Sequence, residues 1–187
     1  MQDENQVSIR LIEIVRQHDA QDEHEVRHRD HVLRFLSESK RPMDRYIYEP
    51  GHITGSAFVG SEDGKHVLLI HHAKLNRWLQ PGGHAEAGET DARHVARREM
   101  EEEVGLVSGE RDGELFDIDV HTIPARGEQP EHFHFDMRYL FLMPRGNVTA
   151  AAEVKDARWF ELEEAERITN EHGLRRMIGK LRKRMEK

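Results

Sequence analysis

Three glutamates close to one another carry the clearest chemical pattern in this chain. Glu99, Glu102 and Glu103 stand three and four residues apart, and on a helix this spacing places them on neighbouring points of one face. Carboxylates this close repel one another unless a cation lies among them. Their oxygens are the ligands that hard divalent ions such as Mg²⁺ and Mn²⁺ prefer. The segment therefore indicates a metal site suited to phosphate chemistry.

A glycine-rich loop leads into this helix and fixes a longer pattern. Glu89 follows Gly83 after five residues, and the segment closes with Arg-Glu-Met-Glu-Glu-Glu-Val-Gly-Leu at 98–106. Together these residues resemble the signature of the Nudix hydrolases, with one difference: eight residues rather than seven separate Glu89 from Arg98. An extra residue inside a helix would rotate every later residue by about 100°. We therefore expect the loop or first turn around 88–91 to absorb it.

The resemblance implies a hydrolase that cuts the pyrophosphate of a nucleoside diphosphate linked to another moiety, with Mg²⁺ or Mn²⁺ as cofactor. Such ions neutralise phosphate charge and acidify a water molecule, which a carboxylate then helps to deprotonate. The resemblance also implies a role for Arg98 in orienting the carboxylates through charge-assisted hydrogen bonds. The implied metal ligands are the Gly83 carbonyl, Glu99, Glu102 and Glu103. The implied catalytic residues are Glu102, Glu103, Glu153 and Arg98.

A second polar pattern lies further along the chain, where His132, His134, Asp136 and Arg138 alternate with apolar residues. On a strand they share one face. Two interpretations stay open: a site that binds substrate or metal, and a hydrogen-bonded polar face packed under a loop. The apolar residues between them would then supply the core on the opposite face of the strand.

Two further residues are predicted to contact substrate. His84 stands next to Gly83 in the glycine loop and could touch a phosphate. Trp78 could stack on a base, and its alternative is a position in the core. Glu128 and Glu131 are alternatives to Glu153 as the additional carboxylate, because their Gly/Pro-containing loop could fold over the site.

The elements that must position these residues alternate along the chain. β-Rich runs at 53–59 and 66–71 flank a Ser-Glu-Asp-Gly turn, and further strands are expected at 115–123, 133–142 and 157–162. The metal helix is expected from about 91 to 104, with Thr90 or Asp91 as N-cap and Gly105 as terminator. A last helix begins near 170. This order predicts an α/β (α+β) fold in which a mixed sheet lies between helices, in keeping with the Nudix resemblance.

The first part of the chain lies outside the resemblance. Apolar stripes at Val7–Leu11–Ile14 and Leu33–Leu36 predict helices, and prolines at 42 and 50 mark a boundary. We therefore expect an N-terminal helical extension over residues 1–45 and a Nudix domain over 46–187. Two short helices do not form a stable core alone. They must pack on the domain, on a second subunit or on both, and a homodimer is the preferred outcome.

Composition narrows the classes of partner. The formal net charge of -8 argues against broad nucleic-acid binding, although a local basic pocket could hold a small nucleotide-type substrate. The chain has no cysteine, which fits a reducing cytoplasm. No apolar run is long enough to span a bilayer, so no membrane partner is expected.

Two other classes of function compete with hydrolysis. The first is a catalytically silent Nudix-like domain that binds a nucleotide for sensing. Pure binders tend to lose the metal carboxylates, whereas Glu99, Glu102 and Glu103 are all present here. The second is an unrelated metal-binding module built on His132, His134 and Asp136. That module would hold Zn²⁺ or Fe²⁺ tightly rather than Mg²⁺ loosely.

Overall fold

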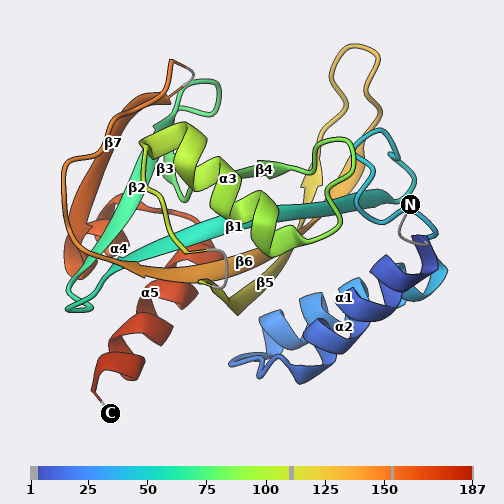
Figure 1. Cartoon of the computed structure of the whole chain (residues 1–187), viewed down its shortest axis with the longest axis horizontal. Helices are drawn as coiled ribbons and strands as arrows, with labels where there is room; N and C mark the ends of the chain where they lie inside the picture. The colour runs from blue at the N-terminus through green and yellow to red at the C-terminus, as the bar shows by residue number, and fades with distance from the viewer. Residues whose placement is uncertain (1–3, 110–111, 153, 187) are drawn as a thin grey trace.

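The computed structural model describes residues 4–109, 112–152 and 154–186, in which helices and strands alternate along the chain (Figure 1). The helices are α1 (Glu4–Gln17), α2 (Glu23–Glu38), α3 (Ala92–Val104), α4 (Leu162–Ile168) and α5 (His172–Met185). The strands are β1 (Gly51–Ser61), β2 (His66–His72), β3 (Arg77–Leu79), β4 (Gly82–His84), β5 (Glu114–Ile123), β6 (His132–Met143) and β7 (Val154–Glu161).

Two long parallel strands form the centre of the sheet. β1 and β6 pair from Gly51 opposite Phe133 to Ser61 opposite Met143, and β5 joins the outer edge of β6 in antiparallel orientation. β2 and β4 pair with β1 on its other side, and β3 and β7 pair with β2. Within the described part of the chain, all seven strands belong to this one sheet, which confirms the predicted mixed topology.

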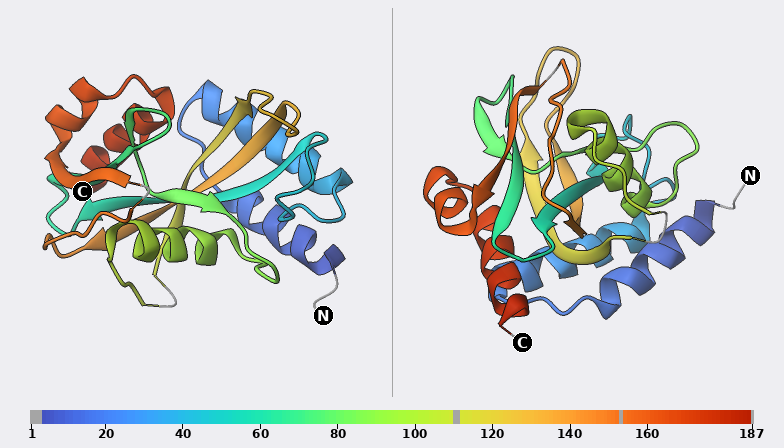
Figure 2. Two further views of the ribbon diagram at one scale, coloured as in Figure 1. Left: turned by 90° about the horizontal axis from the view of Figure 1, so that it is seen from above. Right: turned by 60° about the vertical axis from the view of Figure 1, so that its left-hand side comes forward.

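Helices cover both faces of the sheet. Seen from above, α3 lies on one side and α4 and α5 lie on the other (Figure 2, left). α3 comes very close to β1, because a Cβ at Gly55 would lie only 2.3 Å from the carbonyl oxygen of Ala92. The contact therefore requires glycine. Phe135, Met137 and Tyr139 of β6 are buried in the same cluster as the inner face of α3.

The C-terminal helices close the second face. The predicted apolar stripe of α5, Leu174, Met177, Ile178 and Leu181, is buried against Phe58 of β1 and its neighbours. The short helix α4 and the three-residue strands β3 and β4 were not predicted. Each is too short to show a periodic pattern, and pairing or packing with distant residues holds it in place.

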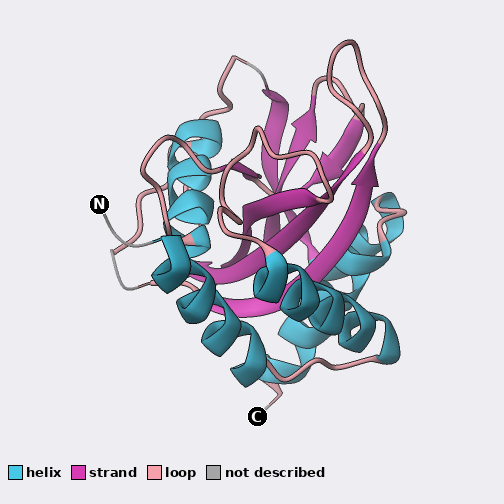
Figure 3. Ribbon diagram, turned by 90° about the vertical axis from the view of Figure 1, so that its right-hand side faces the viewer, coloured by secondary structure: helices cyan, strands magenta, loops and turns pink. Residues whose placement is uncertain are grey.

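The N-terminal helices pack on the domain, as one of the sequence-based alternatives required. α1 and α2 lie side by side beneath one end of the sheet (Figure 1), and Figure 3 shows how the helices surround the strands. Leu11, Val15 and Val32 are fully buried in the α3-side cluster. The ring of Phe35 stacks on that of Phe135 with centroids 4.1 Å apart. No described helix is both long and apolar enough to cross a membrane.

Candidate metal and substrate site

Local sequence signals fix both ends of α3. The Asp91 side chain accepts a hydrogen bond from the backbone N–H of Arg93 at 2.9 Å, which caps the first turn. Gly105 ends the helix in the left-handed region with φ 72°. Ala96 and Met100 are buried in the core, whereas Glu102 is exposed and Glu103 is buried against the glycine loop. The predicted helix and its caps are confirmed.

Arg98 holds the carboxylates of the α3 glutamate face together. Its Nη1 donates to Glu99 Oε1 and Glu102 Oε2, both at 2.9 Å. Its Nε and Nη2 donate to the two carboxylate oxygens of Glu89 at 3.1 Å, and Nη2 also donates to the His84 carbonyl at 2.8 Å. Glu89 therefore reaches Arg98 despite the extra residue between them. The loop ahead of α3 absorbs that residue, as expected.

The glycine loop lies directly against the glutamate face. A Cβ at Gly83 would come within 2.4 Å of Glu99 Oε1, so a larger residue would displace the carboxylate. The Gly82 N–H donates to Glu103 Oε2 at 3.1 Å. Burial raises the pKa of Glu99, and the nearby charge of Glu102 adds to the rise against the opposing effect of Arg98. Clustered carboxylate oxygens beside a backbone strand form a donor set that fits a hard divalent cation.

Four histidines gather on the other face of the same strands. Because β1, β4 and β6 are neighbours in the sheet, His52, His84, His132 and His134 all come together. The Nε2 atoms of His84 and His134 lie 3.1 Å apart. The ring of His52 lies 5.0 Å from that of His134 and 5.2 Å from that of His132, centroid to centroid.

Burial favours the neutral form of three of these imidazoles, those of His52, His84 and His134. It lowers the pKa of His134 to about 2, and the adjacent His84 lowers it further. It lowers the pKa of His84 to about 4, with additional lowering from His52 and from the positive charge of Arg45. The pKa of His52 is also lowered by burial. At neutral pH these three side chains therefore offer nitrogen lone pairs rather than positive charge.

His52 could not be singled out from the sequence. Its signal was only positional, because His52 pairs with His134 across the parallel β1–β6 ladder. That ladder joins segments about 80 residues apart, and local patterns do not reveal which strands become neighbours.

Asp136 and Arg138 share the strand face of the histidines but form a separate buried network. Asp136 accepts hydrogen bonds from the hydroxyls of Thr54 and Ser56. Arg138 Nε donates to Asp136 at 2.8 Å, and its Nη2 donates to Asp119 at 3.0 Å. The hydrogen-bonded polar face proposed as an alternative therefore describes these two residues, whereas His132 and His134 form the histidine cluster.

The remaining candidates lie elsewhere. The Trp78 ring packs on Phe160, with centroids 4.8 Å apart, and beneath the guanidinium of Arg158, in the α5-side apolar cluster. Glu128 and Glu131 are exposed on the loop between β5 and β6. Glu153 lies outside the described residues. Trp78 is therefore partly buried at the edge of this apolar cluster.

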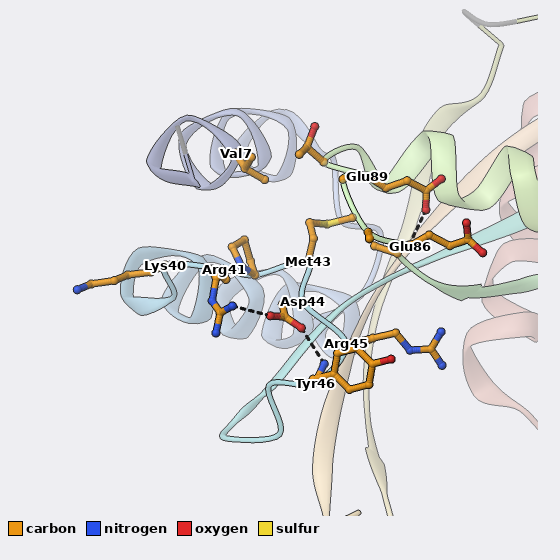
Figure 4. A pocket seen from close by; sticks show the side chains of 14 residues that line it. Val7, Lys40, Arg41, Met43, Asp44, Arg45, Tyr46, Glu86 and Glu89 are labelled. Atoms are coloured by element: carbon orange, nitrogen blue, oxygen red, sulfur yellow. Dashed lines mark hydrogen bonds and ion pairs between the residues drawn. The ribbon is translucent and has the colours of Figure 1, made fainter. Parts of the chain in front are cut away.

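An open pocket of about 1180 Å³ adjoins the glycine loop. One wall is the segment 40–46 that links α2 to β1, and the other is the loop 85–90 (Figure 4). Arg41 pairs with Asp44 at 3.0 Å, whereas Arg45 extends toward the side of the loop that carries Glu86 (Figure 4). The pocket therefore places Arg45 near the glycine loop that precedes α3.

Comparisons with known proteins agree with this architecture. A family model of the NUDIX domain matches residues 51–181. The NUDIX domain of Shewanella oneidensis NrtR, complexed with ADP ribose, is similar in fold at 18% identity and a TM-score of 0.58, over 81% of this chain and 97% of that one. A MutT NUDIX hydrolase from Burkholderia pseudomallei gives 21% identity and a TM-score of 0.54, over 68% of this chain and 95% of that one.

A third similar structure is a binary complex of the C. elegans Ap4A hydrolase. It gives 20% identity and a TM-score of 0.50, over 72% of this chain and 97% of that one. At such identities the likeness establishes the fold alone. No curated protein matches this sequence.

Proposed function

This chain belongs to the Nudix family of hydrolases, and from that premise we propose that it is a divalent-metal-dependent pyrophosphohydrolase. Its substrate would be a nucleoside diphosphate linked to another moiety. One observation carries the proposal: at the junction of β4 and α3, Gly83 lies against Glu99 and the Gly82 N–H donates to Glu103. Arg98 gathers the flanking carboxylates there. A solvated acidic helix would not require a glycine strand packed against its carboxylates.

The proposed metal ligands are the Gly83 carbonyl, Glu99, Glu102 and Glu103. When bound, Mg²⁺ or Mn²⁺ would neutralise phosphate charge and acidify a water molecule. Arg98 would hold Glu99 and Glu102 in place through its hydrogen bonds. Glu102, which is exposed, and Glu103, which the Gly82 N–H orients, are the proposed proton acceptors. Glu153 remains a proposed catalytic residue outside the described part of the chain.

We propose that substrate enters through the pocket between the segment 40–46 and the loop 85–90. Arg45 is placed to meet a phosphate, and His84 continues the same loop into the histidine cluster. His132 and His134 line that cluster, and Asp136 and Arg138 would act by holding β6 in register. Trp78 would contact substrate only if the base reached β3. Two of the similar structures, one complexed with ADP ribose and one of an Ap4A hydrolase, support a small nucleotide-type substrate as the class to test.

Residues 1–45 are proposed to be an extension of the Nudix domain at 46–187, and this extension supplies part of the pocket wall. A homodimer through the N-terminal helices and a cytoplasmic location remain our proposals. The absence of cysteine supports the location. Light scattering of the full chain tests the dimer, and a monomeric mass would contradict it.

Turnover by a Glu103→Gln variant tests the proposed activity. The substitution keeps size and removes one charged ligand, so we expect kcat to fall about 10²–10³-fold. ADP ribose and a dinucleoside polyphosphate would be incubated with Mg²⁺ or Mn²⁺, with released phosphate read after phosphatase treatment. The matched control is Glu101→Gln, because Glu101 is exposed on the same helix and is not one of the three proposed glutamate ligands.

Three outcomes are informative. The proposal is supported if Glu103→Gln loses turnover while Glu101→Gln retains it. Both variants should also unfold at the same temperature as the wild type. A Glu103→Gln rate close to wild type would contradict the metal assignment. Tight nucleotide binding by the wild type without any turnover would favour the sensing domain instead.

A further inference from the structure

The histidine cluster has the geometry of a second, different metal site. His52, His132 and His134 each offer one ring nitrogen, and these nitrogens all lie within 4.8 Å of one another. His52 and His132 are buried and His134 is partly buried, so these nitrogens lie largely away from solvent. Imidazole nitrogen is a ligand that Zn²⁺ and related transition metals prefer, whereas Mg²⁺ prefers oxygen. The glutamate face and the histidine cluster therefore call for different ions.

Two backbone carbonyls orient the rings as metal ligands require. The Nδ1 of His52 lies 2.9 Å from the Ile47 carbonyl, and the Nδ1 of His132 lies 2.8 Å from the Pro130 carbonyl. A carbonyl oxygen only accepts, so each Nδ1 carries the proton and donates. In the neutral form of each ring, Nε2 then carries the free lone pair. Metal-binding histidines are commonly held in this way, with the second nitrogen bonded to a carbonyl or carboxylate.

One of these lone pairs has no hydrogen-bond partner. His52 is 1% exposed, and its Nε2 makes no hydrogen bond within the described residues. A buried polar atom without a partner costs free energy of folding, and such atoms are rare in native proteins. A bound cation would satisfy it.

His84 is placed to complete the coordination. Its Nε2 lies 3.1 Å from the Nε2 of His134. Two ligands of one tetrahedral zinc ion, each at about 2.0–2.1 Å from it, stand roughly 3.3 Å apart. The separation of these two nitrogens therefore already matches a shared metal. The nitrogens of His52, His132 and His134 lie up to 4.8 Å apart, so binding would require these rings to move closer together.

We propose that His52, His132 and His134 bind a transition-metal ion of the zinc class, with His84 as the fourth ligand. The site is distinct from the glutamate face, because the side chain of His84 points away from α3 while its carbonyl accepts from Arg98. β4 thus connects two metal sites of different chemistry. The first would bind a labile hard ion, and the second a tightly held borderline ion.

Zinc binding to chelator-treated full-length protein tests the proposal. Isothermal titration with Zn²⁺ should give one tight equivalent in the wild type. Loss of a residue that merely orients a metal ligand already costs about 10–100-fold in metal affinity, so His132→Asn and His52→Asn should each lose at least about 100-fold. The control His94→Asn removes a half-exposed histidine on α3 and should bind like wild type.

Cobalt reports the geometry independently of affinity. Co²⁺ added to the wild type should give the strong visible absorption of a tetrahedral complex, and His134→Gln should lose it. Zn²⁺ should also raise the unfolding temperature of the wild type and of His94→Asn, and leave that of His132→Asn unchanged. Circular dichroism of each variant without metal confirms that it is folded. The variants His52→Asn and His134→Gln provide the same test if His132→Asn does not fold.

The zinc-binding experiment can fail without contradicting the proposed hydrolase activity, and the reverse also holds. Glu103→Gln should bind Zn²⁺ with wild-type affinity, because it leaves the histidines intact. Equal Zn²⁺ affinity in the wild type and the folded histidine variants, or only weak octahedral Co²⁺ absorption, would overturn the histidine site and leave Mg²⁺-dependent turnover untouched. Loss of Zn²⁺ binding in Glu103→Gln alone would also overturn it, by assigning zinc to the carboxylates.

Discussion

Two clusters of carboxylates in this molecule are built on opposite principles. On α3, a single guanidinium, that of Arg98, serves Glu89, Glu99 and Glu102. In the buried network that joins α2, α5, β5 and β6, acidic and basic side chains are present in nearly equal numbers. The residues of this network are Glu25, Asp117, Asp119, Asp136, Arg138, Arg176 and Lys180.

Asp119 of the buried network and Glu99 of the α3 cluster have pKa shifts of opposite sign, although the pKa of Glu89, which also pairs with Arg98, is lowered. Burial acts to raise the pKa of Asp119, but Arg138 and the flanking histidines outweigh it and lower the pKa strongly. On α3, burial raises the pKa of Glu99, and Arg98 does not compensate. The buried network carries its own counter-ions, whereas the α3 cluster is short of positive charge. The comparison indicates which cluster is structural and which is prepared for a cation from solution.

Removal of a cation from the balanced network should have the largest effect on stability. Arg138→Met would leave Asp119 and Asp136 buried without their partner, so the free energy of unfolding should fall by about 3–5 kcal/mol. Urea unfolding measures it. Arg158→Met is the control, because that arginine pairs with Asp156 at the surface, and its loss should cost at most about 1 kcal/mol. Equal losses in both variants would contradict the assigned structural role.

Acid should weaken the same network in a defined window. Burial alone raises the pKa of Glu25, but hydrogen bonds from His18, Lys180 and the Gln21 N–H lower it to about 2, from an ordinary value of 4.5. Because the folded state holds this proton less tightly, its contribution is complete above pH 4.5 and is lost as the pH falls toward 2. The loss amounts to roughly 3 kcal/mol.

Denaturant unfolding at stepped pH tests this window. Wild type should lose stability more steeply than Glu25→Gln between pH 4.5 and 2, since the variant cannot take up that proton. Parallel curves for the two proteins would show that Glu25 does not contribute the expected pH dependence.

Removal of a negative charge from the α3 cluster should raise the free energy of unfolding, by a smaller amount than the losses above. Glu99→Gln relieves repulsion with Glu102 and Glu89, so the metal-free protein should become more stable by about 0.2–0.5 kcal/mol. Mg²⁺ should stabilise the wild type but not the variant, and so remove or reverse the difference. Thermal unfolding with and without Mg²⁺ measures both. Destabilisation of the metal-free variant would show that this cluster is balanced after all.

The local features of the molecule could be predicted from the sequence. Spacing within one element was enough to predict α3 with its Asp91 cap and Gly105 terminator. It was also enough to predict that His132 and His134 share one strand face. Such features depend on residues a few positions apart, where helix and strand periodicity apply.

The contacts between distant segments could not be predicted. The place of His52 in the cluster depends on its register with β6, and the contact of Glu25 with Lys180 joins residues 155 positions apart. Each of these residues looks like an ordinary polar residue in its own segment. Only the tertiary arrangement decides whether a charged side chain meets a partner, another like charge or solvent.

Manganese binding tests the central claim most directly, namely that the α3 carboxylates await a divalent cation. Electron paramagnetic resonance measures free Mn²⁺, and wild-type protein should deplete its signal. Glu101→Gln and His132→Asn should deplete it equally, because neither residue belongs to the proposed carboxylate site. The double variant Glu102→Gln/Glu103→Gln should leave the signal unchanged. Manganese binding of wild-type strength in the folded double variant would contradict the claim.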